Sequence, residues 1–267
     1  MNSNYYIPQT PKSKELIQFI WQVDGTPAFK NEIIIPKGNV EVIFNFSGVA
    51  VNAQLDDKQV QLTKCFINGF NTSPILVKLP MHHIFFGVQF HPIVIKKLFG
   101  TPVNEITNRV VDLTQIDPEF NSLWHQLAHK ESFTEKAALI CTWAEKKYFD
   151  MQPREQLLNS FLVNELQQTI SVNELAKNIC YSTRQLSRKI YELTGLNTED
   201  ILLYKKYLRS VNLMQHTQLP LTEIAYESHF ADQSHFIKSF RLFAKLAPGE
   251  YRQSKSSVKG HIFEDVR

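Results

Sequence analysis

The chain has 267 residues, of which 43% are hydrophobic and 21% charged, with 29 Lys and Arg against 26 Asp and Glu. This composition excludes fibrous, membrane-embedded and disordered classes, and the length fits two domains. The net charge of +3 does not identify a partner, but its excess lies in the C-terminal part. Residues 1–156 hold 15 basic and 15 acidic side chains, whereas residues 157–267 hold 14 and 11.

The three cysteines, Cys65, Cys141 and Cys180, are far apart and have no metal-ligand spacing. They encode neither a disulfide framework nor a zinc site, which fits a reducing cytoplasm. Residues Met1 to Pro11 are polar and do not resemble a signal peptide, and the most apolar run, Ile84 to Phe90, is too short to span a bilayer. We therefore expect a cytoplasmic protein that does not interact with membranes.

The segment from Glu32 to Phe90 is rich in β-branched and aromatic residues interrupted by turn formers, which predicts short strands. A β-sandwich or barrel-like sheet is the expected assembly. The predicted strands are Ile33 to Pro36, Val40 to Phe46, Val49 to Leu55, Lys58 to Leu62, Lys64 to Asn68, Ile75 to Leu79 and Ile84 to Phe90.

Phenylalanines recur along these strands, and they could line a ligand pocket or form the core of the sheet. Their alternation fits a sheet core, which is the interpretation that we expect to hold. They are Phe44, Phe46, Phe66, Phe70, Phe85, Phe86 and Phe90.

Helical periodicity begins after residue 92. Asp117-Pro118 predicts a helix start, and Ser132 with Glu135 three residues later is a capping-box pattern that opens another helix. These two amphipathic helices form either a packing layer or a dimer surface. Pro153 marks a boundary, after which Arg154 to Thr169 predicts a connecting helix.

From residue 171 onward the sequence predicts helices only. Ser171 with Glu174 and Ser182 with Gln185 are two capping boxes, and Gly195 is a C-cap. Apolar residues follow both boxes at helical spacing, so two short helices are joined by a tight turn, as in a helix-turn-helix. The apolar residues are Val172, Leu175, Ala176, Ile179, Leu186, Ile190 and Leu193.

The pattern is repeated further along the chain. Leu221 to Ala225 repeats Val172 to Ala176 at an offset of 49 residues, and Phe236 to Phe240 repeats Leu186 to Ile190 at an offset of 50. Between the copies, Thr198 to Met214 predicts a linking helix of about 25 Å. Such a rod would hold two recognition helices about one turn of DNA apart, since major grooves on one face recur every ~34 Å.

These motifs resemble the AraC/XylS-type bacterial transcription regulators over about a hundred residues. The matching positions are Leu175-Ala176, Ser182, Leu186, Arg188 and Gly195, followed by Ile224 to Glu227, Phe230, Asp232 to Phe236, Phe240, Pro248 and Tyr251-Arg252. Cys180 and His229 stand where the family has glycine in the turn, and Lys245 and Thr198 replace Gly and Pro. A non-glycine residue with positive φ would cost about 1 kcal/mol.

The N-terminal part resembles the sensor domains of this family more weakly, through Pro36 to Glu41 and Gly87 to Pro92. The resemblance implies an α+β fold with a divergent cupin-like sheet, packing helices and a double helix-turn-helix. We expect a sensor or dimerisation domain at residues 1–152, a connecting helix at 153–170, a DNA-binding domain at 171–253 and a polar, fraying tail at 254–267.

Side chains between the core positions of each recognition helix must point outward, toward DNA or only toward solvent. Arg can bind guanine through two hydrogen bonds and Gln suits adenine. The resemblance implies that Arg184 and Arg188 read bases, and the further predicted base contacts are Gln185, Gln233, Ser234, His235 and Lys238. The predicted backbone contacts are Ser182, Lys189, Lys205 and Arg241. Lys206 is a further candidate for phosphate contact.

No catalytic motif is present, and we predict no enzymatic activity and no cofactor. A metal site at His82, His83 and His91 would need a third-ligand spacing that the sequence lacks, so we expect ordinary surface or core histidines.

The sequence thus predicts a sequence-specific DNA-binding transcription regulator. Double-stranded DNA is the expected partner, with a small-molecule effector, a second copy of the chain and, for an activator, RNA polymerase as further candidates. An effector or dimerisation through Pro118 to Tyr148 would reorient the DNA-binding half. The alternatives are an effector-independent architectural DNA binder and a cupin-type enzyme fused to a DNA-binding domain.

Overall fold

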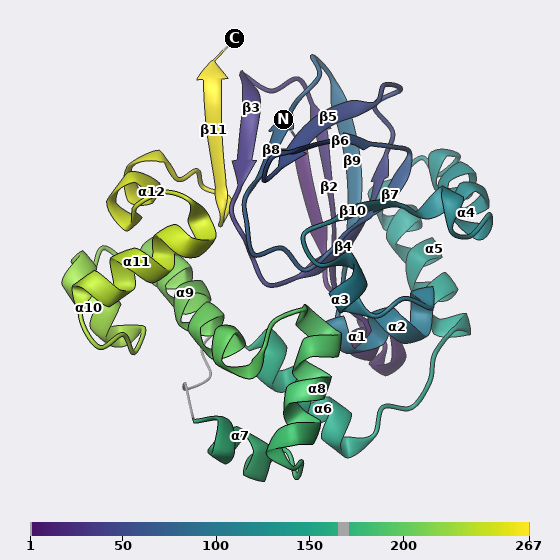
Figure 1. Cartoon of the computed structure of the whole chain (residues 1–267). Helices are drawn as coiled ribbons and strands as arrows, with labels where there is room; N and C mark the ends of the chain where they lie inside the picture. Colours follow the sequence, from purple (N-terminus) through teal and green to yellow (C-terminus); the bar gives the residue numbers. More distant parts are fainter. Residues whose placement is uncertain (1, 165–170, 267) are drawn as a thin grey trace.

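The computed structural model describes residues 2–164 and 171–266, and it has an α+β architecture. Two β-sheets form the N-terminal part, and helices flank them and make up most of the C-terminal part (Figure 1). The first sheet has the strand order β1-β2-β9-β4-β7-β10, and the second has the order β11-β3-β8-β5-β6. Neighbouring strands are antiparallel in both sheets.

Seven of these strands correspond to the seven predicted ones. They are β3 (Phe29–Ile34), β4 (Val40–Asn45), β5 (Val51–Leu55), β6 (Lys58–Leu62), β7 (Cys65–Asn68), β8 (Ile75–Lys78) and β9 (His83–Phe90). The strands that the sequence did not predict are β1 (Asn2–Tyr6), β2 (Ile17–Gly25), β10 (Val110–Asp112) and β11 (His261–Val266). Of these, β1, β10 and β11 are edge strands. β1 is almost entirely exposed, so it lacks the alternating apolar pattern of a buried strand.

The central strands of the first sheet are buried on both faces. In β7, Cys65 and Ile67 face the helices, whereas Phe66 lies in the core between the two sheets. This alternation follows from the two-residue period of a strand. The seven phenylalanines of the sequence pattern are all buried or half-buried, which confirms the core interpretation over the ligand pocket.

Six helices belong to the N-terminal part and its connection. They are α1 (Pro11–Leu16), α2 (Pro92–Phe99), α3 (Val103–Ile106), α4 (Glu119–Ala128), α5 (Phe133–Lys146) and α6 (Pro153–Val163), and a 3₁₀ turn, η1, spans Leu113–Gln115. The predicted capping box at Ser132 and Glu135 is present. The connecting helix ends at Val163, and the remainder of its prediction falls on residues 165–170, outside the described residues.

The apolar faces of helices α4 and α5 pack against the N-terminal domain. Trp124 of α4 donates a hydrogen bond from Nε1 to the carbonyl of Asn45 at 3.0 Å and packs against Phe46. Phe133 of α5 lies against Phe86 of the first sheet. The packing-layer interpretation of these two helices is therefore the one that the structure supports.

Six helices form the C-terminal part, with α9 connecting two pairs (Figure 1). They are α7 (Val172–Asn178), α8 (Thr183–Thr194), α9 (Thr198–His216), α10 (Leu221–Glu227), α11 (Gln233–Ala244) and α12 (Pro248–Ser254). With 19 residues, α9 is about 28 Å long.

Helix α9 also contacts the N-terminal domain. The fully buried Tyr204 accepts a hydrogen bond from Gly38 N and donates one to the carbonyl of Asn71, both at 2.9 Å. Tyr207 donates to the carbonyl of Pro36 at 3.1 Å. Gly38 has a φ of +70°, and a Cβ there would lie 2.7 Å from Leu208, so only glycine fits this approach.

The expectation that the chain frays after Gln253 is wrong. Residues His261–Val266 form β11, which pairs with β3 at the edge of the second sheet. A polar segment can form an edge strand because its backbone groups pair with the neighbouring strand whatever its side chains are. Among the described helices, none combines the length and apolarity needed to cross a membrane.

Candidate nucleic-acid interface

The first helix-turn-helix unit consists of α7 and α8. Ser171 caps α7 and Ser182 caps α8, each in a complete capping box with Glu174 and Gln185 respectively. Leu186 and Ile190 are fully buried on the inner face of α8. Both helices therefore begin where the capping boxes in the sequence predicted.

The second unit consists of α10 and α11 and follows the same plan. Phe230 N donates to the carbonyl of Ala225 at 3.0 Å, and in the first unit Tyr181 N donates to the carbonyl of Ala176 at 2.9 Å. Asp232 caps α11 by accepting from the amide of His235. These equivalent hydrogen bonds show that the internal repeat in the sequence is a repeat of structure.

Three residues that stand where the family has glycine adopt a positive φ. Cys180 has φ +57°, His229 has φ +62° and Lys245, at the end of α11, has φ +59°. Since this region disfavours side chains with a Cβ, each residue carries a local cost of about 1 kcal/mol, and His tolerates the region better than most.

On α8, the predicted base readers lie on the exposed side. Arg184 and Arg188 are exposed. Gln185 is exposed as well, but its Oε1 accepts hydrogen bonds from Ser182 N and Oγ at 3.0 Å, so part of its amide serves the cap. Lys189 is half-buried and lies 3.4 Å from Glu192. The two arginines are therefore the α8 side chains most available to a duplex.

On α11, Gln233, Ser234 and Lys238 are exposed, as is Arg241 nearer its C-terminus. His235 is half-buried, and its ring meets Phe230 edge-on with centroids 5.4 Å apart. Its orientation is thus fixed by packing rather than left to solvent.

The predicted role of Lys205 as a DNA backbone contact is wrong. Lys205 is 3% exposed, and its Nζ donates to the carbonyls of Phe161 and Asn164 at 2.5 and 2.8 Å. These carbonyls belong to the C-terminal end of α6, where a cation is favoured by the helix dipole. Lys205 therefore joins α6 to α9 inside the protein.

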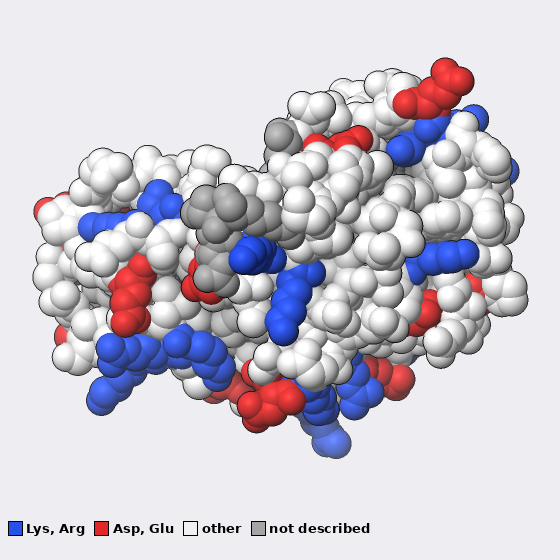
Figure 2. Space-filling model, turned by 90° about the horizontal axis from the view of Figure 1, so that it is seen from above, with Lys and Arg blue, Asp and Glu red and all other residues white. Residues whose placement is uncertain are grey.

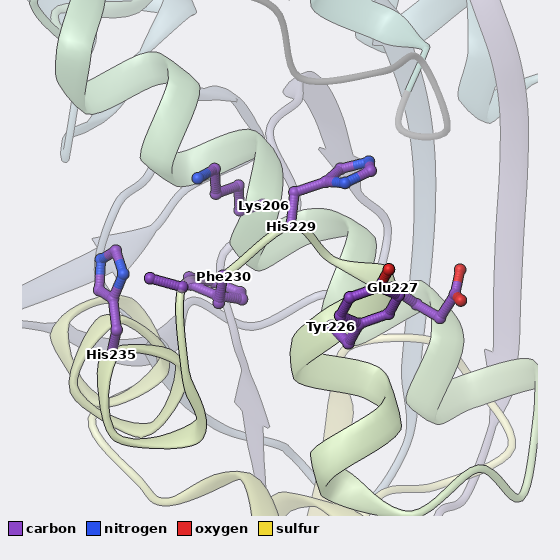
Figure 3. Close-up of a pocket in the computed structure, with 7 residues that line it drawn as sticks. Lys206, Tyr226, Glu227, His229, Phe230 and His235 are labelled. Carbon is purple, nitrogen blue, oxygen red and sulfur yellow. The ribbon is translucent and has the colours of Figure 1, made fainter.

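A hollow of about 390 Å³ lies beside the turn of the second unit. It is lined by Lys206, Tyr226, Glu227, His229, Phe230, Ala231 and His235. Figure 3 shows His235 of α11 on one side of Phe230 and His229 turned away on the other. Partial burial, followed by the charges of Arg209 and Lys206, lowers the pKa of His229. The hollow thus brings Lys206 and Glu227, which have opposite charges, together with two histidines.

The sequence reasoning did not single out Tyr226 as a functional candidate, although it lines this hollow and is 78% exposed. Helical periodicity does indicate its exposure, because Tyr226 follows the core positions Ile224 and Ala225 on α10 and must therefore lie outside the core.

On the face seen from above in Figure 2, basic and acidic side chains are interspersed among uncharged ones.

The three histidines of the metal hypothesis lie in different surroundings. His82 pairs with Asp24 at 3.4 Å, His83 is buried, and His91 Nε2 lies 3.1 Å from the carbonyl of Lys14. Burial lowers the pKa of His91. Within the described residues, no group of three or more His, Cys, Asp and Glu side chains could hold a metal ion.

Comparisons with known proteins agree with this geometry. Residues 175–254 match a family model described as a helix-turn-helix domain. Over 102 residues the chain is 28% identical to the HTH-type transcriptional activator RhaS of Escherichia coli. The C-terminal domain is therefore similar to helix-turn-helix domains of transcription regulators. The match to RhaS covers 38% of this chain, which spans 37% of the length of RhaS.

The N-terminal part matches a different model. Residues 7–112 match a domain of unknown function (DUF6597). Among solved structures, ToxT from Vibrio cholerae O395 is similar over 96% of this chain and 98% of its own, with 13% identity and a TM-score of 0.49. An AraC-type regulator from Chromobacterium violaceum is similar over 39% of this chain and 92% of its own, with 24% identity and a TM-score of 0.35.

Proposed function

We propose that this protein is a sequence-specific DNA-binding transcription regulator. The observation that carries the proposal is the pair of helix-turn-helix units connected by α9, each with exposed hydrogen-bonding side chains on its second helix. The length of α9, about 28 Å, approaches the ~34 Å repeat of the major groove. The match to transcription factors rather than to an enzyme family supports the same function.

In this proposal the second helix of each unit reads base edges. Arg184 and Arg188 would recognise guanine through paired hydrogen bonds, and Lys238 occupies the place of Arg188 in the second unit. The full set of proposed base contacts is Arg184, Gln185, Arg188, Gln233, Ser234, His235 and Lys238.

Backbone contacts would come from the edges of the units. Ser182, Lys189 and Arg241 remain candidates, and the hollow beside the second turn adds Lys206 and His229. Phosphate contacts of this kind increase affinity and salt dependence without reading sequence.

The N-terminal domain would regulate DNA binding in response to a small-molecule effector. Its direct contacts with α9 give a bound effector a route to the DNA-binding half. Dimerisation through α4 and α5 would have to use their outer faces, because their apolar stripes pack on the first sheet. A thermal-shift screen against small metabolites tests this part, and an absence of any stabilising compound would favour an architectural DNA binder.

The central test is the substitution Arg188→Ala in a gel-shift assay. The probe is a duplex that the full-length protein selects from a randomised pool. We expect a loss of about 1–3 kcal/mol of discrimination between the selected duplex and a scrambled one. Lys146→Ala is the matched control, because it removes an equal charge from an exposed position on α5. Unchanged selectivity in Arg188→Ala would contradict the assigned role.

A further inference from the structure

The last strand of the chain belongs to the sheet of the other domain. β11 pairs with β3 in an antiparallel register that runs from His261 opposite Ile34 to Val266 opposite Phe29. Just before it, the carbonyl of Gly260 accepts a hydrogen bond from Ile35 N at 2.9 Å. The DNA-binding half is therefore joined to the N-terminal domain by a backbone ladder as well as by the hydrogen bonds of Tyr204 and Tyr207 on α9.

Side chains reinforce this ladder. The ring of Phe263 stacks on that of Phe29, with centroids 3.9 Å apart and planes within 7°. His261 lies between two charged side chains, with Nδ1 2.6 Å from Glu32 Oε1 and Nε2 3.3 Å from Lys37 Nζ. The pairing is thus specific in its side chains as well as its backbone.

The other end of this segment is fixed to the second helix-turn-helix unit. The fully buried Tyr251 of α12 accepts a hydrogen bond from Gly260 N at 3.2 Å, and its ring lies 5.7 Å from that of Phe240 on α11. A displacement of α11 away from the second sheet would consequently pull on β11.

The first unit is anchored to the N-terminal domain separately. Thr107 Oγ1 donates to the carbonyl of Thr194 at the end of α8, and Lys96 of α2 pairs with Glu192 at 2.7 Å. With each unit held by its own contacts, the N-terminal domain restrains the relative placement of the two recognition helices, which α9 connects. On DNA, the duplex must set that placement, because both helices have to enter grooves of fixed spacing.

β11 is the contact that can open with least disturbance. It is the edge strand of the second sheet, and β3 remains paired with β8 on its other side.

We propose that β11 is an autoinhibitory strap that holds the second helix-turn-helix unit on the N-terminal sheet and must leave β3 for full DNA affinity. The inference rests on the proposed DNA-binding function and assigns its regulation. The strapped and released forms are in equilibrium, and a duplex that prefers the released form shifts the population toward it. An effector acting on the N-terminal domain would act through the same equilibrium.

The first experiment removes the strap. A chain truncated after Ser257 lacks β11, and its affinity is measured on a duplex that the full-length protein selects from a randomised pool. We expect binding about 10-fold tighter than that of the full-length protein. Phe263→Ala should shift affinity in the same direction by a smaller factor. Its matched control is Val258→Ala, an apolar truncation at a side chain that is 46% exposed, which should leave affinity unchanged.

The second experiment locks the strap. Glu32 and Phe263 are Cα partners across the ladder, and directly opposed strand residues are close enough for a disulfide. The double variant Glu32→Cys with Phe263→Cys, in a Cys180→Ser background that removes the exposed native thiol, should lose affinity about 10-fold on oxidation and regain it with reductant. Reversal by reductant separates locking from misfolding.

The outcomes distinguish a failure of the proposed autoinhibitory role of β11 from a failure of the proposed DNA-binding function. Tighter binding by the truncated chain together with weaker binding by the locked chain supports the strap. If both bind the selected duplex with the affinity of the full-length protein, the strap is overturned while DNA binding stands. If neither the full-length protein nor any variant selects a duplex, the proposed DNA-binding function is wrong, and the autoinhibitory role of β11 is overturned as well.

Discussion

The two helix-turn-helix units share a backbone plan but are stabilised by different means. In the first unit, the inner face of α8 is aliphatic, with Leu186 and Ile190, and both helices begin in capping boxes. In the second unit, Phe240 of α11 packs among aromatic rings, and α10 begins after Pro220 without a side-chain cap. One motif can therefore be held by caps around a small core or by a larger core with fewer caps.

The units also differ in how they are tied to the rest of the protein. The first is anchored by contacts of α8 with α2 and α3, including the hydrogen bond from Thr107 to the carbonyl of Thr194. Gly195 ends α8 there with φ +73°, and a Cβ would lie 2.4 Å from Thr107 Oγ1. The second is anchored through α12 and β11. Four experiments test this comparison.

The largest expected effect is on core packing. Phe240 and Ile190 occupy equivalent positions of α11 and α8, and both are fully buried. We expect Phe240→Ala to lower the free energy of unfolding by about 4 kcal/mol and Ile190→Ala by about 3 kcal/mol, measured by urea denaturation. The exposed Tyr226 is the control, since Tyr226→Ala should change stability by less than about 0.5 kcal/mol. A larger cost at Ile190 would contradict the view that the second unit depends more on its core.

The next effect concerns two adjacent lysines of α9. Lys205→Met removes the hydrogen bonds to the end of α6 and should lower the free energy of unfolding by about 2 kcal/mol. The matched change Lys206→Met, at a half-buried position beside the hollow, should cost less than about 0.5 kcal/mol but should reduce the salt dependence of DNA binding. A loss of stability in Lys206→Met and a reduced salt dependence in Lys205→Met would contradict the placement of these side chains.

A smaller effect is expected at the turns. Cys180 and His229 both have positive φ, so glycine should relieve strain at each site. Cys180→Gly should raise the free energy of unfolding by up to about 1 kcal/mol, and His229→Gly by less, because His tolerates this conformation better than Cys. Thermal denaturation of the two variants provides the comparison, and destabilisation by Cys180→Gly would show that its thiol makes a stabilising contact.

The smallest effect is a difference in acid sensitivity at the first helices of the units. Hydrogen bonds from the backbone and side chain of Ser171 lower the pKa of Glu174. A lowered pKa in the folded state means that the contribution is present above the ordinary glutamate pKa and is lost as pH falls through the lowered value.

Acidification should therefore loosen α7, while α10, which has no side-chain cap at its N-cap residue, should show no such change. Amide exchange measured by NMR between pH 6 and pH 3 tests this, with Glu174→Gln as the control that removes the titration. Equal loss of protection in α7 and α10 would contradict it.

Much of the fold could be predicted because its signals are local. The capping boxes at Ser171 and Ser182 need only residues three positions apart, and the repeat at offsets of 49 and 50 residues follows from the sequence alone. Exposure of Arg184 and Arg188 also follows from helical periodicity once Leu186 and Ile190 are assigned to the core.

The failures share a different cause. Lys205 was predicted to face DNA, but ten of the residues of α9, including Lys205, are buried. Which lysine of the pair Lys205 and Lys206 is enclosed depends on where the C-terminus of α6 lies, and that is a long-range contact. Edge strands such as β1 and β11 escaped prediction for a related reason, since their pairing partners are supplied by distant parts of the chain.

The sequence by itself determined the capped starts of α5, α7 and α8, the duplicated motif and the side chains on the outer faces of α8 and α11, because capping and periodicity act over a few residues. Only the tertiary structure decided that Lys205 is buried, that the apolar faces of α4 and α5 pack on the first sheet, and that the C-terminal residues form the edge strand of the second sheet. Each of these depends on contacts between segments far apart in the chain, which no local pattern encodes.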